Sequence, residues 1–156
     1  MSRESPSNRR LASNRKARHN YLILEKLEAG IVLVGTEVKS ARAGKIQLKD
    51  SHVEVVEGEA YLVGAHISPY THGNRQNHDP ERRRKLLLKR REIERLMGRI
   101  TIQGQTCVPL EVYLKGNRIK VEIALAKGKK LYDKRQAEKV KLIDKEAREA
   151  LQSHRR

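Results

Sequence analysis

The chain has 156 residues, in which 35 Lys and Arg outnumber 19 Asp and Glu to give a formal net charge of +16, and only 37% of the residues are hydrophobic. This length suits one small, strongly basic domain with tail-like extensions. The longest apolar runs are four residues, far short of the about 20 that a membrane helix needs. We therefore expect a cytoplasmic protein with no membrane span and no secretory signal. A single cysteine, Cys107, excludes an internal disulfide or a zinc finger.

The positive charge is concentrated in three segments. Residues 1–20 hold six basic residues and one acidic residue, residues 81–99 hold nine and three, and residues 127–156 hold eleven and five, so the other 87 residues carry a net charge of −1. A single basic run is usually a solvated face. Three runs attached to a near-neutral body favour a nucleic-acid partner, because clustered Lys and Arg release its condensed counterions.

The first half of the chain predicts a leader, a strand, a helix and a hairpin. Residues 1–12 are polar and predict a disordered leader. Residues 21–34 are rich in β-branched and aliphatic residues and predict a long strand with a bend or bulge at Gly30. Residues 35–44 predict a short helix that ends at Gly44. Alternation over 47–67 predicts a hairpin with its turn at 57–59, followed by a loop over 68–78.

The second half predicts a helix, a hairpin and a tail. Apolar spacing predicts a helix near 89–98, after a cap at Asp79 and Pro80. Val108, Leu110, Val112 and Leu114 occupy alternate positions, as do Ile119, Val121, Ile123 and Leu125, so each set is expected to share one face of an antiparallel hairpin with one buried side. Residues 127–156 are a basic C-terminal tail, disordered or helical, whose thin apolar stripe predicts folding on a target.

These elements predict a mainly β fold with short helices. Five or six antiparallel strands within residues 13–126 favour a small, closed or partly closed barrel of the oligonucleotide-binding (OB) type, with a sandwich as the alternative. The chain has no Phe or Trp and five Tyr, so it offers few platforms on which unpaired bases stack. Recognition of a folded RNA through its shape and phosphates is therefore favoured.

Catalytic and metal sites have little support in the sequence. His66, His72 and His78 are spaced by six residues, which matches no zinc-ligand pattern, so a metal-dependent nuclease is a distant third hypothesis. The chain contains no G-x-G-x-x-G, Walker A or G-x-S-x-G motif. Cys107 falls within the hairpin pattern and is interpreted as a small strand residue. We expect a protein that is not an enzyme and needs no metal or cofactor.

Several sequence blocks occur in the order found in one known family. They are Asn14–Tyr21, Glu28–Gly30, Gly35–Ser40, Arg42–Gly44, His66–Tyr70, His78–Pro80, Arg84–Leu88, Val121–Lys130 and Asp133–Arg135. In these blocks the chain resembles the SsrA-binding protein family, also called small protein B or SmpB, the bacterial partners of transfer-messenger RNA (tmRNA). The resemblance implies an OB-type adaptor that binds the tRNA-like domain of tmRNA and delivers it to stalled ribosomes for trans-translation, which rescues the ribosome and tags the nascent chain.

The resemblance also implies partners and contact residues. The partners are tmRNA, the decoding centre and message channel of the ribosome, and the elongation factor that carries aminoacyl-tRNA, with the protein acting as a monomer. Glu28 and Leu87 match family positions tied to RNA binding. The expected RNA contacts are Asn14, Arg15, Lys16, Arg18, His19, Glu28, Lys39, Arg42, Lys45, Arg84, Lys85, Leu87 and Lys89.

The tail carries the expected ribosome contacts. They are Lys127, Gly128, Lys129, Lys130, Tyr132, Asp133, Lys134 and Arg135. Two residues depart from common family choices: some members have Asn in place of Lys89, and many have His in place of Tyr132. A tyrosine ring preserves stacking and removes any proton-dependent role. The alternative hypothesis is a generic basic OB-fold or ribosomal-type nucleic-acid-binding protein.

Overall fold

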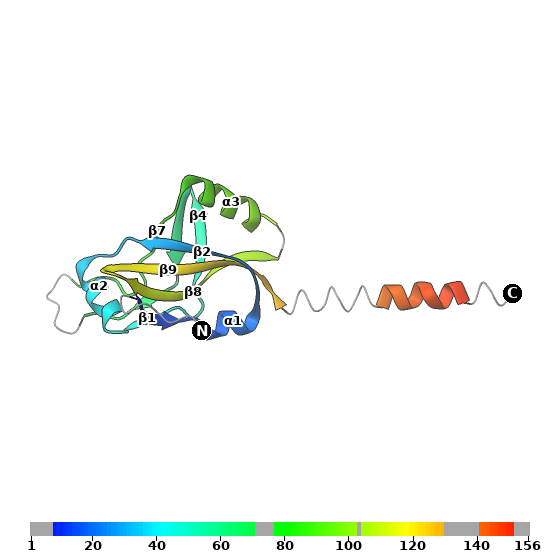
Figure 1. The fold of residues 1–156 in the computed structure, drawn as a ribbon, viewed down its shortest axis with the longest axis horizontal. Coiled ribbons are helices and arrows are strands. Elements are labelled where there is room, and N and C mark those ends of the chain that lie inside the picture. Colours follow the sequence, from blue (N-terminus) through cyan, green and yellow to red (C-terminus); the bar gives the residue numbers. More distant parts are fainter. Residues whose placement is uncertain (1–7, 71–76, 103, 130–140, 152–156) are drawn as a thin grey trace.

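A computed structural model describes residues 8–70, 77–102, 104–129 and 141–151 of the chain. It is mainly antiparallel β with short helices (Figure 1). The elements are β1 (Asn8–Ser13), α1 (Arg15–Asn20), β2 (Tyr21–Ile31), α2 (Gly35–Arg42), β3 (Ile46–Gln47), β4 (His52–Val56), β5 (Glu59–Val63), β6 (His66–Ile67), β7 (Arg84–Leu87), α3 (Arg90–Ile100), β8 (Gln105–Lys115) and β9 (Arg118–Gly128). Residues 141–151 are also helical, with exposed side chains.

Seven strands form one antiparallel sheet in the order β1-β8-β9-β2-β7-β5-β4, and β3 pairs with β6. The sheet curls so that β4 approaches β8, while β1 and β4 remain its two edges. This is the predicted OB-type architecture, as a barrel that is not closed by hydrogen bonds in the described part of the chain. No helix among the described residues has the length and apolar character needed to cross a membrane.

Two apolar cores hold the barrel together. The main core lies inside the curled sheet, where Leu62, Leu86 and Ile123 are fully buried, and α3 contributes Leu96 and Ile93 to it. A smaller core lies where α1 packs on the outer side of β8 and β9, through Ala17, Val108, Leu110, Ala124 and Ala126. The β8–β9 hairpin is therefore buried on both sides over part of its length.

A bulge at Leu110 explains why the predicted pattern in β8 is wrong. Pro109 pairs with Ile123 and Glu111 pairs with Glu122, so Leu110 is an extra residue in β8. An extra residue moves the following side chains to the opposite face. Val108 and Leu110 consequently belong to the small core, whereas Val112 and Leu114 belong to the main core.

The bulge of β2 does not lie at Gly30, where the sequence predicts a bend or a bulge. In β2 the register shifts between Ile23 and Glu25, which places the extra residue at Leu24. Gly30 instead pairs with Leu87 of β7. A Cβ atom at Gly30 would lie 3.1 Å from the Cβ atom of Leu87, so the glycine allows the two strands to approach closely.

The N-terminal prediction fails for residues 8–12. These residues belong to β1, which pairs with β8. Leu11 is buried in the main core, and Arg10 forms a 3.0 Å ion pair with Glu111. The helix α1 was also not predicted. Residues 1–7 lie outside the described residues.

The predicted helices and hairpins are confirmed, whereas residues 71–76 of the predicted loop and residues 130–140 and 152–156 of the predicted tail lie outside the described residues. Helices occur at α2 and α3, and hairpins occur at β4–β5 and β8–β9. Glu57 and Gly58 both have positive φ, at 51° and 76°, as the two-residue turn of a hairpin requires. The strand β9 continues to Gly128, two residues past the predicted end of the barrel at 126.

Substituting Gly98 should stabilise the protein. Gly98 lies in α3, and a Cβ atom there would meet nothing within 4 Å. Glycine in a helix costs about 0.5–1 kcal/mol relative to alanine. We expect Gly98→Ala to raise the free energy of unfolding by about that amount in urea denaturation.

Gly64→Ala is the control for Gly98→Ala. Gly64 has a φ of +84°, and a Cβ atom there would lie 3.2 Å from the Asp50 carbonyl oxygen. The same substitution at Gly64 should therefore lower stability. Equal effects of the two substitutions would contradict this explanation.

Candidate RNA interface

A buried ion pair joins α2 to β7. The side chains of Glu37 and Arg84 are both fully buried, and Arg84 Nε donates to Glu37 Oε2 at 2.6 Å. Arg82 Nη2 donates to Glu37 Oε1, also at 2.6 Å. The remaining donors of Arg84 reach the carbonyl oxygens of Ala65 and Pro80 at 2.7 and 3.0 Å. The prediction that Arg84 contacts phosphate is therefore wrong, because its guanidinium is enclosed and used within the fold.

Glu37 is held in its ionised form. Burial alone would raise the pKa of this carboxyl group, but hydrogen bonds from Arg82, the Val34 N–H and Arg84 outweigh burial and hold the pKa below its ordinary value. The Val34 N–H donates to Oε1 at 2.9 Å, so Glu37 also caps its own helix. One carboxylate thus links the start of α2 to β7 and to Arg82 just before it.

Asn14 is a second predicted contact that proves to be structural. Its side chain is only 4% exposed. The Oδ1 atom accepts from the Ala17 N–H at 3.1 Å and caps α1, while Nδ2 donates to the Leu48 and Pro109 carbonyl oxygens. Asn14 therefore positions α1 and offers no free group to RNA, which corrects the prediction.

The cations of α1 lie on the surface. Arg15, Lys16, Arg18 and His19 are all exposed. Lys16 Nζ lies 2.7 Å from Asp50, and Arg18 lies between Glu111 and Glu122 at 3.8 and 3.7 Å. Surface carboxylates therefore hold Lys16 and Arg18 in place.

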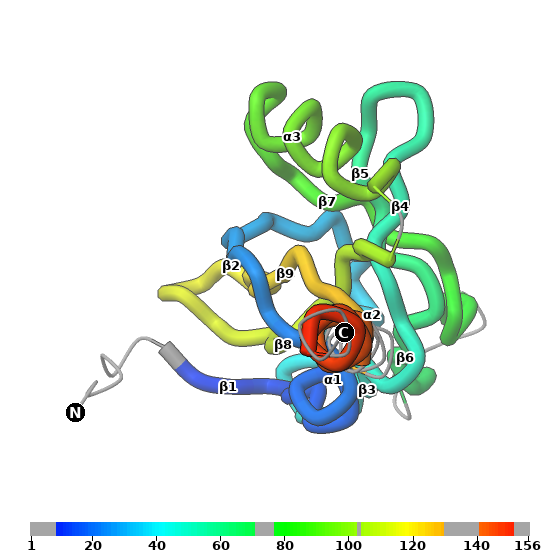
Figure 2. The backbone as a smooth tube through the Cα atoms, turned by 90° about the vertical axis from the view of Figure 1, so that its right-hand side faces the viewer, coloured from blue at the N-terminus to red at the C-terminus, as the bar shows by residue number. Residues whose placement is uncertain are grey.

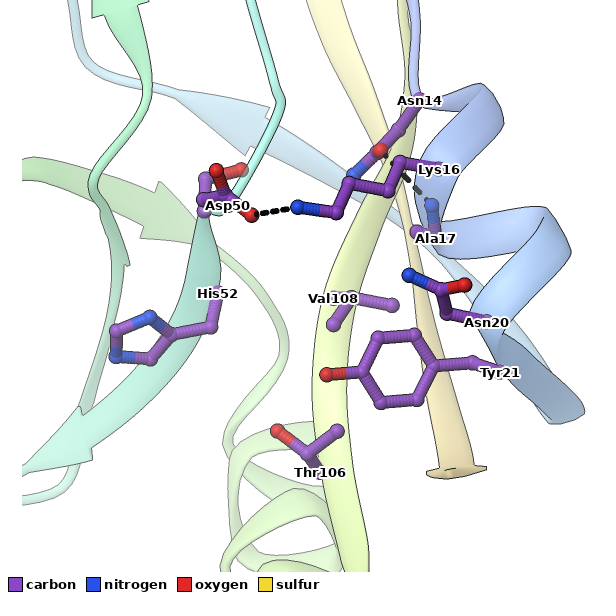
Figure 3. Close-up of a pocket in the computed structure, with 10 residues that line it drawn as sticks. Asn14, Lys16, Ala17, Asn20, Tyr21, Asp50, His52, Thr106 and Val108 are labelled. Atoms are coloured by element: carbon purple, nitrogen blue, oxygen red, sulfur yellow. Dashed lines mark hydrogen bonds and ion pairs between the residues drawn. The ribbon is translucent and has the colours of Figure 1, made fainter. Parts of the chain in front are cut away.

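A polar hollow of about 460 Å³ lies beside α1. Figure 3 shows the side chains of Asn20, Tyr21, His52 and Thr106 around it, with the Lys16–Asp50 pair at its rim. The Tyr21 ring packs against the small core. This hollow adjoins the predicted α1 contacts and combines hydrogen-bonding groups with one aromatic face.

Glu28 is fixed on the outer face of the sheet. The Tyr113 hydroxyl donates to Glu28 Oε2, and Lys115 Nζ lies 3.1 Å from Oε1. The Tyr113 hydrogen bond has the largest effect on the pKa of Glu28, and together with the hydrogen bond and charge of Lys115 it outweighs burial and holds that pKa below its ordinary value. Burial and the neighbouring Glu28 raise the pKa of Tyr113. Glu28 is therefore an oriented carboxylate at neutral pH, suited to accept from base amino groups.

Leu87 lies beside Glu28 as an exposed apolar side chain. Its exposed fraction is 54%. It borders a hollow of about 330 Å³ that also includes Val38 of α2 and Ile119 of β9, with Arg118 and Lys120 at the rim. An adjoining hollow is lined by Glu28, Lys85, Leu87, Lys89 and Lys120. The structure thus brings four predicted contacts together and adds Lys120.

The third group of predicted contacts lies on and after α2. Lys39, Arg42 and Lys45 are exposed, and Lys39 Nζ lies 5.4 Å from the centre of the Tyr70 ring. The views show α2 and α1 at opposite ends of β9 (Figure 1). The predicted residues therefore form three groups, on α1, on β2–β7 and on α2.

Sequence reasoning missed Tyr113, Lys115 and Lys120. All three occupy outward positions of β8 and β9 near Glu28 or Gly30. Alternation within the hairpin predicts that these side chains face away from the core, but it does not show that β9 pairs with β2. Of the predicted tail contacts, Lys127 and Gly128 are the last residues of β9 and Lys129 is exposed. Lys130, Tyr132, Asp133, Lys134 and Arg135 lie outside the described residues.

Two groups that a metal or catalytic site could use, His78 and Cys107, serve the fold instead. Both ring nitrogens of His78 are engaged, with Thr36 Oγ1 and the Ile67 carbonyl oxygen, each at 2.8 Å. His72 lies outside the described residues. Cys107 is buried in β8, and burial raises its pKa to about 12. Among the described residues no cluster of three or more His, Cys, Asp or Glu can hold a metal ion.

Comparison with known proteins gives the family. The family model described as SmpB protein matches residues 11–153. This chain belongs to the SmpB family. An SsrA-binding protein from Pelobacter propionicus is 58% identical over 146 residues, which cover 94% of this chain and 96% of that protein. Another from Acetivibrio thermocellus is 60% identical over 126 residues, covering 81% and 82%.

A solved structure agrees with the fold of this SmpB-family chain. It is described as "tmRNA-SmpB: a journey to the center of the bacterial ribosome". The match has a TM-score of 0.64 and 49% sequence identity, and it covers 74% of this chain and 82% of that chain. The recognition made from the sequence blocks is therefore confirmed.

Removing the carboxylate of Glu37 should be costly. Glu37→Gln leaves the buried Arg84 without its anion, and we expect a loss of about 3–5 kcal/mol in the free energy of unfolding. The folded pKa of Glu37 lies below the ordinary 4.5. The carboxylate thus contributes its full stability above pH 4.5 and loses it as pH falls through the folded pKa.

Urea denaturation from pH 7 down to about pH 3 tests this sign. The stability gap between wild type and Glu37→Gln should narrow as the solution becomes acidic, because a protonated Glu37 resembles glutamine. A gap that stays constant would show that the charge of Glu37 is not what matters. The exposed Glu57 provides the control, since Glu57→Gln should change stability by less than about 0.5 kcal/mol.

The hydroxyl of Tyr113 should control the ionisation of Glu28. Tyr113→Phe removes the largest interaction that lowers the pKa of Glu28, so that pKa should rise toward 4.5. NMR titration of the Glu28 carboxyl carbon measures this directly. Tyr61→Phe is the control, because the Tyr61 ring contacts Arg83 on another part of the sheet. An unchanged Glu28 pKa in Tyr113→Phe would refute the assignment.

Proposed function

We propose that this SmpB-family chain is a non-catalytic RNA adaptor that binds the tRNA-like domain of tmRNA and carries it to stalled ribosomes for trans-translation. Relatives 58% and 60% identical to it are named SsrA-binding proteins. The solved structure that matches it is titled for tmRNA-SmpB and the bacterial ribosome. On this proposal the protein acts in the cytoplasm and needs no metal or cofactor.

The surface around Glu28 and Leu87 carries the proposal. It combines an ionised, oriented carboxylate with a half-exposed leucine, and Lys85, Lys89 and Lys120 surround both. The lysines suit phosphates, which set the position of an RNA without reading its sequence. Glu28 suits base amino groups, and Leu87 suits the face of a base or sugar. A surface that binds only by charge would not require an acid or a leucine at its centre.

The cations of α1 and α2 extend this surface. Arg15, Lys16, Arg18, His19, Lys39, Arg42 and Lys45 are exposed and suited to phosphates on either side of the Glu28–Leu87 centre. The basic tail after β9 is assigned to the decoding centre and message channel of the ribosome. The elongation factor that carries aminoacyl-tRNA and the monomeric state stay predictions. The alternative, a generic basic OB-fold protein, differs because it would bind folded RNAs with similar affinity.

Removing the tail should separate the two proposed activities. The cut belongs after Lys129, because Lys127 and Gly128 pair with Leu22 and Tyr21 and are part of the barrel. The truncated protein should bind the tRNA-like domain of tmRNA almost as tightly as the full chain, and it should fail in a reconstituted assay of tagging on stalled ribosomes. Loss of RNA binding on truncation would contradict this division of roles.

Leu87→Ala in the full chain is the reciprocal variant. It should weaken binding to the tRNA-like domain about tenfold, because covering a leucine side chain is worth about 1.5–3 kcal/mol when burial is complete. An unrelated RNA hairpin serves as the competitor. If wild type binds both RNAs equally, or Leu87→Ala weakens both equally, the generic alternative is correct.

A further inference from the structure

Helix α3 presents a row of arginines that the proposed function does not use. Ile93 and Leu96 bury one side of the helix in the main core. Arg91, Arg95 and Arg99 are exposed and recur every four residues, which places them along one strip of the opposite side. Each step of four residues advances about 6 Å along the helix axis. In Figures 1 and 2, α3 lies on the side of the barrel opposite α1.

The acidic residues of α3 do not neutralise this row. Glu92 Oε1 accepts from the Lys89 N–H at 2.8 Å and caps the helix. Glu94 pairs with Arg90 at 3.5 Å on the other flank. Within the described part of the chain, no carboxylate lies within 4.0 Å of the guanidinium of Arg91 or Arg99. No carboxylate of the described residues therefore compensates these two positive charges of the row.

The C-terminal half of the row borders a hollow of about 380 Å³ beside the end of β9. Arg95 and Arg99 line it together with Gln105 and Lys127. Glu25 is its one carboxylate among the described lining residues and forms a 3.1 Å ion pair with Arg95. Three cations against one anion leave this hollow positive. Lys127 links it to the start of the basic tail.

Gly98 adds an independent observation on the same side of α3. A Cβ atom at Gly98 would meet nothing within 4 Å, so packing within the barrel does not require glycine there. Between Arg95 and Arg99 the helix backbone is thus left bare. A partner can approach the helix closely at this point, with arginines on both sides of the contact.

We propose that Arg91, Arg95, Arg99 and Lys127 form a second RNA-binding surface, which holds the phosphate backbone of a double-helical RNA. Evenly spaced cations on a rigid helix suit a regular array of phosphates, and the deep, narrow major groove of a double-helical RNA keeps arginines from the base edges, so the contact is with the backbone. This goes beyond the proposed function, because it assigns RNA binding to a face of the protein that does not include Glu28 or Leu87.

The test uses the full chain and an RNA duplex of about 16 base pairs. Binding is measured between about 50 and 200 mM salt for wild type and for Arg91→Gln/Arg99→Gln. Each phosphate contact removed should lower the slope of log K against log salt by about 1. We therefore expect the double variant to lose up to about two units of slope and about tenfold or more in affinity at low salt. Glutamine favours helices, and circular dichroism checks that α3 is intact.

Two matched variants control for charge and for structure. Arg90→Gln removes an exposed arginine from the same helix whose charge Glu94 already offsets, so its slope should stay close to that of wild type. Arg91→Lys/Arg99→Lys keeps both charges and should keep most of the slope. If Arg91→Gln/Arg99→Gln changes binding no more than Arg90→Gln does, the proposal is overturned.

A polyglutamate competitor distinguishes RNA from an acidic protein surface. If polyglutamate displaces the duplex at equal charge concentration, and does so through Arg91 and Arg99, the RNA assignment is overturned. This test is separate from that of the proposed function. The preference of wild type for the tRNA-like domain over an unrelated hairpin depends on Glu28 and Leu87. That preference can be absent while Arg91→Gln/Arg99→Gln still lowers the slope of log K against log salt for the duplex.

Discussion

The buried pair of Glu37 and Arg84 is the interaction on which the arrangement of the RNA surface depends. Two charges without water are tolerated only because their hydrogen-bonding groups are satisfied, by each other, by Arg82 and Val34, and by the carbonyl oxygens of Ala65, Asp79 and Pro80. The pair ties α2 to β7. Val38 and Leu87 therefore meet at one hollow, and the cations on α2 keep a fixed position relative to Lys85 and Leu87. Removing either partner would leave the other as an unpaired charge in the core.

Alternation along the chain was enough to predict both long hairpins, because each strand places its apolar residues on one side wherever the register is constant. It failed at β8 because a leucine can be buried on either face of this strand, so the local sequence does not show that Leu110 is the extra residue. It failed at β1 because that strand has only one large apolar residue, Leu11, and its partner strand lies about a hundred residues away along the chain. Long-range pairing, and not propensity, makes these residues ordered.

The binding residues also divide into those that the sequence identifies and those that only the tertiary structure identifies. Motif blocks identified Glu28 and Leu87, and the structure places them side by side. The same blocks included Arg84 and Asn14, whose side chains the fold encloses. A basic or amide residue in an RNA-binding motif has two physical explanations, a contact with phosphate and the satisfaction of buried carbonyl oxygens. Only tertiary contacts distinguish them: Asn14 bridges Leu48 to Pro109, and Arg84 reaches Ala65 and Pro80. Lys120 is the opposite case. It lies outside the motif blocks, and the pairing of β9 with β2 places it opposite Gly30 at this surface.

Several surface cations of the folded body are accompanied by a carboxylate that holds them. Glu111 and Glu122 hold Arg18, Asp50 holds Lys16, and Glu25 holds Arg95. Such exposed pairs contribute about 0–1 kcal/mol or less to stability, so their main effect is to orient the cation. An RNA phosphate that reaches Arg18 or Arg95 must displace or share that carboxylate, which lowers the net gain at those positions. Glu28 differs because its partners, Tyr113 and Lys115, leave it facing the surface as an acceptor. Discrimination among RNAs therefore depends on this one acid and on Leu87, while the excess of positive charge supplies attraction to any RNA.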